Sequence, residues 1–217
     1  MTPLAVTAHL RGRISLPGGP LALDAMLASV VAMRAQLPHP SDELVPIEIP
    51  VEREPSGRFH LCSFSEAAFE DYSVQWVNRR FPIAEAQAFG EPRLKRLDIT
   101  TGPAKSYRIP LETGHLEHDR LRWWCIGDAA QIEDLLSQVH YLGKKRAVGL
   151  GAVHRWTIAA AQLWDGFPVV RDGMPLRPLP VDWPGLSEEA PRTLRALTYP
   201  YWLHTARQVC AAPRGLG

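Results

Sequence analysis

Residues 143–151 combine three glycines with three consecutive cations, and they stand between two segments of clear periodicity. A helical pattern over residues 128–142 precedes this loop, and a strand pattern over residues 152–161 follows it. The order helix, glycine turn, strand excludes a dinucleotide-binding fingerprint, which needs strand, glycine turn, helix. A Walker A loop is also excluded, because Val148 occupies the place of its second glycine. The loop therefore offers backbone freedom and three charges, without a phosphate site at a helix N-terminus.

The loop has the properties that a nucleic-acid backbone requires of its binding site. Glycine permits positive φ and close approach of another chain, and lysine and arginine neutralise phosphates. An ordinary alternative is a Schellman motif that ends the helix at Gly143, followed by a basic turn. On the first interpretation, the residues expected to contact a nucleic-acid backbone are Gly143, Lys144, Lys145, Arg146, Gly149 and Gly151, with His154 and Arg155 at the start of the next strand.

The composition narrows the class of protein. The 217 residues have a formal net charge of only +1, so any affinity for nucleic acid has to come from local patches. Cys62, Cys125 and Cys210 are isolated in the sequence, which predicts neither a zinc knuckle nor a disulfide framework and fits a reducing compartment. The first residues lack the pattern of a signal peptide, and no apolar run has the length of a membrane span. We therefore expect a cytoplasmic protein with no membrane partner.

The periodicity of the remaining chain predicts an α+β fold. Strands are expected over residues 4–16, 45–51, 58–64, 120–126 and 152–161, helices over 22–37 and 128–142, and a hairpin with an Asp-Gly turn over 167–176. When residues 65–119 are treated as an insertion, the order is close to βαββαβ, the ferredoxin-like (RRM-like) arrangement. We expect this core and its insertion to occupy residues 1–161, with residues 162–217 forming a C-terminal hairpin and aromatic tail packed on the core.

The insertion is basic and aromatic, and no periodicity predicts its fold. Over residues 71–110, seven cations are set against four anions, and aromatic residues are interleaved with them. This mixture suits a single-stranded nucleic acid, whose phosphates need charge and whose bases need flat partners. The alternative is an insertion whose aromatic side chains pack inward and whose charges are solvated. Candidate nucleic-acid contacts outside the loop are Arg11 and Arg13 in the first strand, and Arg79, Arg80, Arg93, Lys95, Arg96 and Lys105 in the insertion.

Three motifs resemble those of one protein family. Residues 21–28 (LALDAMLA) resemble the "L-x-L-D-A-L-L-A" opening of the first helix in the 5′-handle-binding (Cas5-like) subunit of type IV CRISPR effector complexes, within the RAMP superfamily. Residues 142–151 (LGKKRAVGLG) resemble the "LGKKR-x-x-G-x-G" loop of that subunit. Residues 199–202 (YPYW) resemble its "P-P-Y-W" signature, with tyrosine in place of the first proline. The resemblance thus extends over most of the chain.

The resemblance implies a non-catalytic RNA-binding subunit without a metal or other cofactor. Such a subunit caps the 5′ handle of the CRISPR guide RNA, contributes to assembly of the ribonucleoprotein, and contributes to recognition of target DNA near its protospacer-adjacent motif. Its implied partners are the guide RNA, target DNA, and the other subunits of the complex, namely the backbone RAMP subunits and the large subunit.

Three other functions are alternatives to this one. Some RAMP relatives cleave CRISPR repeat RNA without a metal, and His140, Tyr141, Lys144 and His154 flank the loop as candidates for such a set. A helix over 128–142 would place the first two on different sides, which argues against it. A metal site is not expected, since one H-x-x-H pair at His115 and His118 lacks further ligands. A protein-binding scaffold is the third alternative.

Asp24 could be mistaken for a catalytic acid. It lies in the first turn of the expected helix, where a negative charge favours the helix dipole. No candidate base lies near it in the sequence, and we therefore expect a structural role for it.

Overall fold

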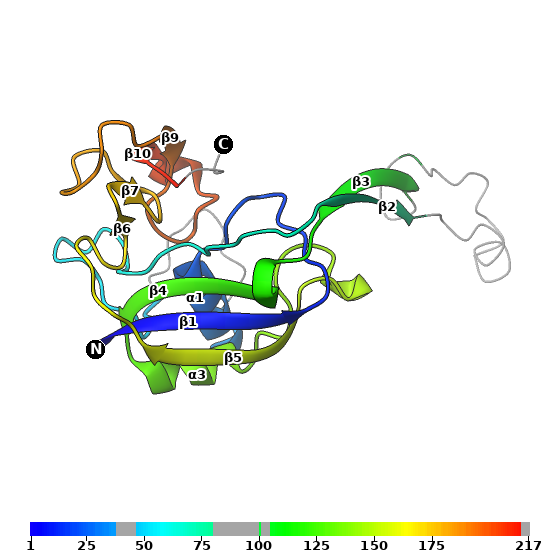
Figure 1. Ribbon diagram of the computed structural model, residues 1–217, viewed down its shortest axis with the longest axis horizontal. Helices are drawn as coiled ribbons and strands as arrows, with labels where there is room; N and C mark the ends of the chain where they lie inside the picture. Colours follow the sequence, from blue (N-terminus) through cyan, green and yellow to red (C-terminus); the bar gives the residue numbers. More distant parts are fainter. Residues whose placement is uncertain (38–46, 80–99, 101–104, 214–217) are drawn as a thin grey trace, which may run out of the picture.

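The computed structural model describes residues 1–37, 47–79, 100 and 105–213 (Figure 1). The strands are β1 (Thr2–Arg11), β2 (Ser73–Arg79), β3 (Tyr107–Thr113), β4 (Arg120–Gly127), β5 (Ala152–Ala160), β6 (Val170–Arg171), β7 (Met174–Pro175), β8 (Leu179–Pro180), β9 (Arg192–Arg195) and β10 (Gln208–Ala211). The helices are α1 (Leu23–Arg34) and α3 (Ala129–Leu136), with 3-10 turns η1 (Glu117–Asp119), η2 (Arg146–Val148) and η3 (His204–Ala206). The predicted α+β class is confirmed.

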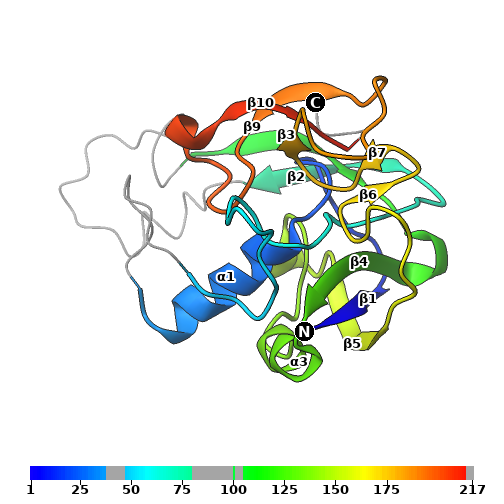
Figure 2. The same ribbon diagram turned by 90° about the vertical axis from the view of Figure 1, so that its left-hand side faces the viewer.

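The central sheet has the order β4-β1-β5, and β1 runs antiparallel to both neighbours. Alternate residues of β1, such as Val6 and Ala8, are fully buried and belong to the main core, as the period of two predicts. The two helices of the described chain cover the same face of this sheet (Figure 2). The order and directions of the strands are consistent with a ferredoxin-like arrangement. The opposite face, turned to the viewer in Figure 1, is left to present polar side chains.

The predicted strands over 45–51 and 58–64 do not form a regular hairpin in the described residues. The segment from Val51 to Glu66 instead follows the free edge of β4 through isolated bridges, which pair Val51 with Gly127 and Glu66 with Arg122. Pro55 lies in this segment and has no N–H group to donate. A side chain replaces one ladder bond, because the N–H of Trp124 donates to Oγ of Ser63 at 2.9 Å. The prediction of regular strands here was therefore wrong, although the segment does occupy the edge of the sheet.

Two predicted elements are shorter than the periodicity indicated. The strand predicted over 4–16 ends at Arg11, where Gly12 takes a φ of 75°. The helix predicted over 128–142 begins with the expected cap, since Asp128 accepts the N–H of Gln131 at 3.0 Å, but it ends at Leu136. The following residues pair with the start of β5, and the N–H of Val153 donates to the carbonyl of His140 at 2.8 Å. The helix consequently does not run directly into the glycine loop.

Part of the insertion forms a two-stranded arm. Strands β2 and β3 pair from Ser73 opposite Thr113 to Arg79 opposite Tyr107, and the arm projects from the body of the molecule (Figure 1). The Trp76 side chain is 54% exposed, and the guanidinium of Arg108 lies 4.5 Å from its ring centroid. For Trp76, the alternative of inward packing is therefore wrong.

The C-terminal residues form a second lobe beside the central sheet. It contains the small sheet β8-β10-β9 and the hairpin β6–β7. The hairpin confirms the prediction over 167–176, because Asp172 and Gly173 both take positive φ at its turn. A separate apolar cluster that includes Phe59, Leu179 and Leu197 fills this lobe. Phe59 comes from the irregular segment along β4, so that segment connects the two cores.

A buried ion pair joins the second lobe to α1. Arg177 and Asp24 have no exposed side-chain surface, and Nη2 of Arg177 lies 3.2 Å from Oδ2 of Asp24. The hydroxyl of Tyr201 donates to the same carboxylate at 2.7 Å. Burial raises the pKa of Tyr201, so its hydroxyl stays protonated and available as a donor. Asp24 therefore holds distant parts of the chain together, in addition to its place in the first turn of α1.

No helix in the described part of the chain combines the length and apolar character that a bilayer span requires.

Candidate nucleic-acid interface

The three glycines of the loop have different surroundings. Gly143 and Gly151 take φ of 76° and 66°, and a Cβ on either would collide with a backbone carbonyl oxygen, that of Ser15 or of Leu142. Their need for glycine is thus explained by packing within the chain. Gly149 has a φ of 86° and open space where a Cβ would stand. Of the three, Gly149 is the position at which the loop backbone is free to approach another molecule.

The three cations of the loop also differ. Lys144 and Arg146 are exposed. Lys145 is half-buried, and its Nζ donates to the hydroxyl of Tyr107 at 3.2 Å while lying 5.2 Å from that ring's centroid. Since Tyr107 begins β3, Lys145 attaches the loop to the arm. Lys144 and Arg146 remain available to bind phosphates.

The loop leads directly into two more predicted contacts on β5. His154 and Arg155 are exposed, and β5 begins opposite Arg11, which is exposed at the end of β1. His154 is the extra residue of a β-bulge, because the pairing shifts between His9 and Leu10 of β1. The loop and the adjacent ends of β1 and β5 therefore bring Lys144, Arg146, Arg11, His154 and Arg155 to one end of the sheet.

Arg13 has partners within the chain. Its guanidinium donates to Asp71 at 3.1 Å, to Oγ1 of Thr113 at 3.0 Å and to the carbonyl of Thr113 at 2.9 Å. Asp71 and Thr113 lie at the base of the arm, beside His115. In this structure Arg13 thus attaches the arm to the end of β1.

The carboxylate of Asp71 gives this attachment a pH dependence. Hydrogen bonds from His115, and then from Arg13, lower the pKa of Asp71 to about 2 from an ordinary 3.8. Because the folded-state pKa is the lower one, the stabilisation is present above about pH 3.8 and is lost as the pH falls towards about 2. We expect urea unfolding to show an advantage of wild type over Asp71→Asn that is constant above about pH 5 and shrinks below about pH 4. An advantage that stays constant through the acidic range would contradict this assignment.

The remaining candidates lie in the insertion. Lys105 is exposed just before β3. Arg79 ends β2, where its backbone pairs with Tyr107, and its side chain is not among those described. The candidates that lie outside the described residues are Arg80, Arg93, Lys95 and Arg96.

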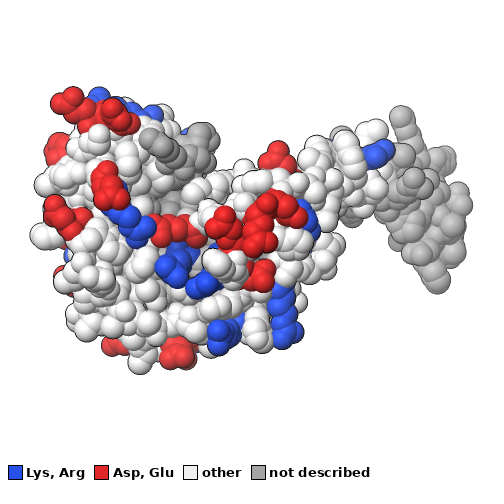
Figure 3. Space-filling model, viewed as in Figure 1, with Lys and Arg blue, Asp and Glu red and all other residues white. Residues whose placement is uncertain are grey.

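The face of the sheet opposite the helices is also basic. His9 of β1 stands between Arg120 of β4 and Arg155 of β5 in the strand register, and the next row contains Arg122 and Thr7. Figure 3, viewed as Figure 1, shows basic side chains over this region with acidic side chains along its upper border. Burial, and then the charges of Arg155, Arg120 and His154, lower the pKa of His9. His9, Arg120 and Arg122 were not predicted as contacts, because only the register of three strands brings them together.

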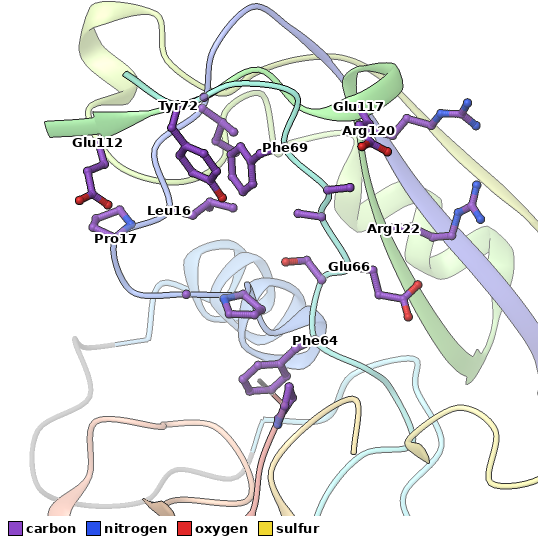
Figure 4. Close-up of a pocket in the computed structure, with 18 of the residues that line it drawn as sticks. Leu16, Pro17, Phe64, Glu66, Phe69, Tyr72, Glu112, Glu117, Arg120 and Arg122 are labelled. Carbon is purple, nitrogen blue, oxygen red and sulfur yellow. The ribbon is translucent and has the colours of Figure 1, made fainter. Parts of the chain in front are cut away.

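A groove with a volume of about 980 Å³ borders the basic face (Figure 4). Phe69 and Tyr72 stack in it with ring centroids 4.5 Å apart, and Tyr72 is 67% exposed. The charged or titratable residues that line it are Glu66, Glu112, Glu117, His118, Arg120 and Arg122. In Figure 4, the side chains of Arg120 and Arg122 point away from the aromatic pair. Aliphatic, proline and aromatic side chains supply most of the remaining lining, and the three carboxylates outnumber the two arginines, so the groove suits a neutral or aromatic group better than a phosphate.

The candidates for a nuclease site are not joined to one another. In the described part of the chain, no hydrogen bond connects the side chains of His140, Tyr141, Lys144 and His154. Tyr141 forms a backbone bridge with Ala152, so its position is set by pairing with β5. Within the described ranges, no group of three or more His, Cys, Asp or Glu residues is arranged to hold a metal ion.

Comparison with known families places most of the chain in a described family. Residues 63–213 match the family model described as CRISPR type IV associated protein Csf3. The match includes the glycine loop, β4, β5 and the second lobe, so it extends over well more than half of the chain. No curated protein matches the sequence.

Proposed function

Since the chain belongs to the Csf3 family of CRISPR type IV associated proteins, we propose that it is the non-catalytic, guide-RNA-binding subunit of a type IV CRISPR ribonucleoprotein. It caps the 5′ handle of the guide RNA in the manner of a Cas5-like RAMP protein. It also contributes to assembly with the backbone RAMP subunits and the large subunit, and to recognition of target DNA beside the protospacer-adjacent motif.

The observation that carries this proposal is the exposed basic end of the central sheet. Lys144 and Arg146 are free on either side of Lys145, which secures the loop to the arm. Arg155 extends the same surface along β5. A single strand that lies on this end meets cations for its phosphates and, at Gly149, a backbone that it can approach closely.

The geometry supports binding better than cleavage. Acid–base catalysis needs two side chains that converge on one scissile bond. The four candidates beside the loop make no side-chain hydrogen bonds with each other in the described structure. We therefore assign them to RNA binding or to structure, and assign cleavage of the precursor RNA to another protein.

The proposal is tested by purifying the chain from cells that also express a CRISPR array. We expect a short RNA with one defined 5′ end to co-purify, and we expect purified protein to leave repeat RNA intact. Protein free of RNA would overturn the proposal in favour of a protein-binding scaffold. Site-specific cleavage of repeat RNA that His154→Ala abolishes would overturn it in favour of the endoribonuclease.

A further inference from the structure

Three neighbouring strands present their basic side chains in one row across the open face of the sheet. His9 lies opposite Arg120 of β4 on one side and opposite Arg155 of β5 on the other. Residues opposite each other on adjacent antiparallel strands have Cβ atoms about 5 Å apart. The whole row is thus about 10 Å wide, and both of its outer members are permanently charged.

This row lacks the acidic partners that usually accompany such a cluster. No ion pair involves Arg120, Arg122 or Arg155 within the described ranges, although other arginines on the molecule are paired. Glu117 and Asp119 are exposed in the 3-10 turn before β4, and neither lies within ion-pair distance of Arg120. Arg120 and Arg155 therefore flank His9 with no carboxylate in the described chain to neutralise them. An arrangement of this kind is suited to an anionic ligand.

The row continues the basic end of the sheet. Arg155 belongs both to the row and to the surface that begins at the glycine loop, and His154 lies next to it. On the far side, Arg120 and Arg122 reach the rim of the groove, where Arg122 lies 5.5 Å from the ring centroid of Trp124. Basic groups therefore lie at the loop, on β5, on β1 and on β4.

We propose that the guide RNA runs from the glycine loop across the open face of the sheet, with phosphates of its backbone bound by Arg155 and Arg120 and with His9 between these two arginines. This inference rests on the proposed function and adds a path for the RNA. An open basic face bordered by a groove that contains the Phe69–Tyr72 ring pair suits a single strand, because the bases of a single strand are free to turn away from its backbone. A DNA duplex would present a rigid convex surface, which a row only three strands wide contacts at few points.

The test uses the full chain, a labelled single-stranded RNA of the repeat sequence, and a DNA duplex of equal length. We expect Arg120→Gln/Arg155→Gln to weaken RNA binding by about tenfold and to reduce the slope of log K against log salt by about 1.4. The matched control is Arg192→Gln/Arg207→Gln, which removes two exposed arginines from the second lobe and leaves both quantities unchanged. The lysine variant Arg120→Lys/Arg155→Lys retains most of the affinity, because it retains the charges.

A second measurement is independent of any folding defect. Bound phosphates favour the charged form of a nearby imidazole, so the pKa of His9 is expected to rise when the RNA binds to wild-type protein. A titration followed by nuclear magnetic resonance of the His9 ring measures this pKa, which burial and then the charges of Arg155, Arg120 and His154 lower in the free protein.

The outcomes separate the two proposals. If Lys144→Ala/Arg146→Ala weakens RNA binding while the row variant and the pKa of His9 are unchanged, the path is wrong and the proposed function stands. If wild-type protein binds no RNA, the proposed function fails, and the path fails with it. If the row variant impairs only duplex binding, the surface belongs to target DNA and the assignment to guide RNA is overturned.

Discussion

Replacing Arg177 with methionine is expected to lower the free energy of unfolding by about 3–5 kcal/mol, which is the usual cost of leaving one member of a buried ion pair behind. Arg177 and Asp24 are fully buried, so no water replaces the lost guanidinium. Arg177 also donates to the carbonyls of Leu197 and Cys62, and these acceptors lose their partner as well. Urea unfolding followed by circular dichroism measures the change.

The matched control is Arg34→Met. Arg34 pairs with Asp134, but their side chains are 36% and 64% exposed, and such pairs contribute about 0–1 kcal/mol. A further variant, Asp24→Asn/Arg177→Met, removes both charges and should recover part of the loss, because no uncompensated charge remains buried. Equal, small effects of Arg177→Met and Arg34→Met would show that the buried pair contributes little.

The second large effect is expected at the glycine loop. Substituting alanine for Lys144, Lys145 and Arg146 together should weaken binding of repeat RNA by about 10- to 100-fold and reduce the salt slope by about 2. Because Lys145 already contacts Tyr107, the double variant Lys144→Ala/Arg146→Ala should account for most of the loss. Fluorescence anisotropy over a range of salt concentrations measures both quantities.

Two results would contradict this expectation. Unchanged affinity and slope in the triple variant would remove the loop from the RNA interface. An effect of equal size in Arg192→Ala/Arg207→Ala, on the second lobe, would show that the measurement reports overall charge and no particular site.

Local signals were sufficient to predict much of the fold. The alternation in β1 and β4, the cap at Asp128 and the turn at Asp172-Gly173 each depend on a few neighbouring residues, and all are present in the structure. Contacts between residues far apart in the sequence determine the parts of the fold that these signals did not predict. The segment from Val51 to Glu66 is an irregular edge because its partners are groups on β4, and the apolar spacing of a sequence does not reveal such partners.

The candidate site was predictable only where its residues are neighbours in the sequence. Contiguous cations such as Lys144 and Arg146 are visible in a sequence. The row on the sheet is not, because Arg120 and His9 become neighbours only through the register of β1 and β4. The role of Arg13 at the base of the arm likewise depends on residues about 100 positions away. The one available signal for the row was alternation, which places Arg120 and Arg122 on the face opposite buried Leu121.

The buried ion pair between Asp24 and Arg177 also affects the order in which parts of the chain can fold during synthesis. Asp24 leaves the ribosome 153 positions before Arg177 and 177 positions before Tyr201. At ordinary rates of elongation, this interval is roughly 10 to 30 s. Throughout it, burial of α1 would enclose the carboxylate of Asp24 without its partners, so we expect α1 to dock stably only after the second lobe has been made. On this expectation, the apolar face of α1 is exposed to chaperones for most of the synthesis of the chain.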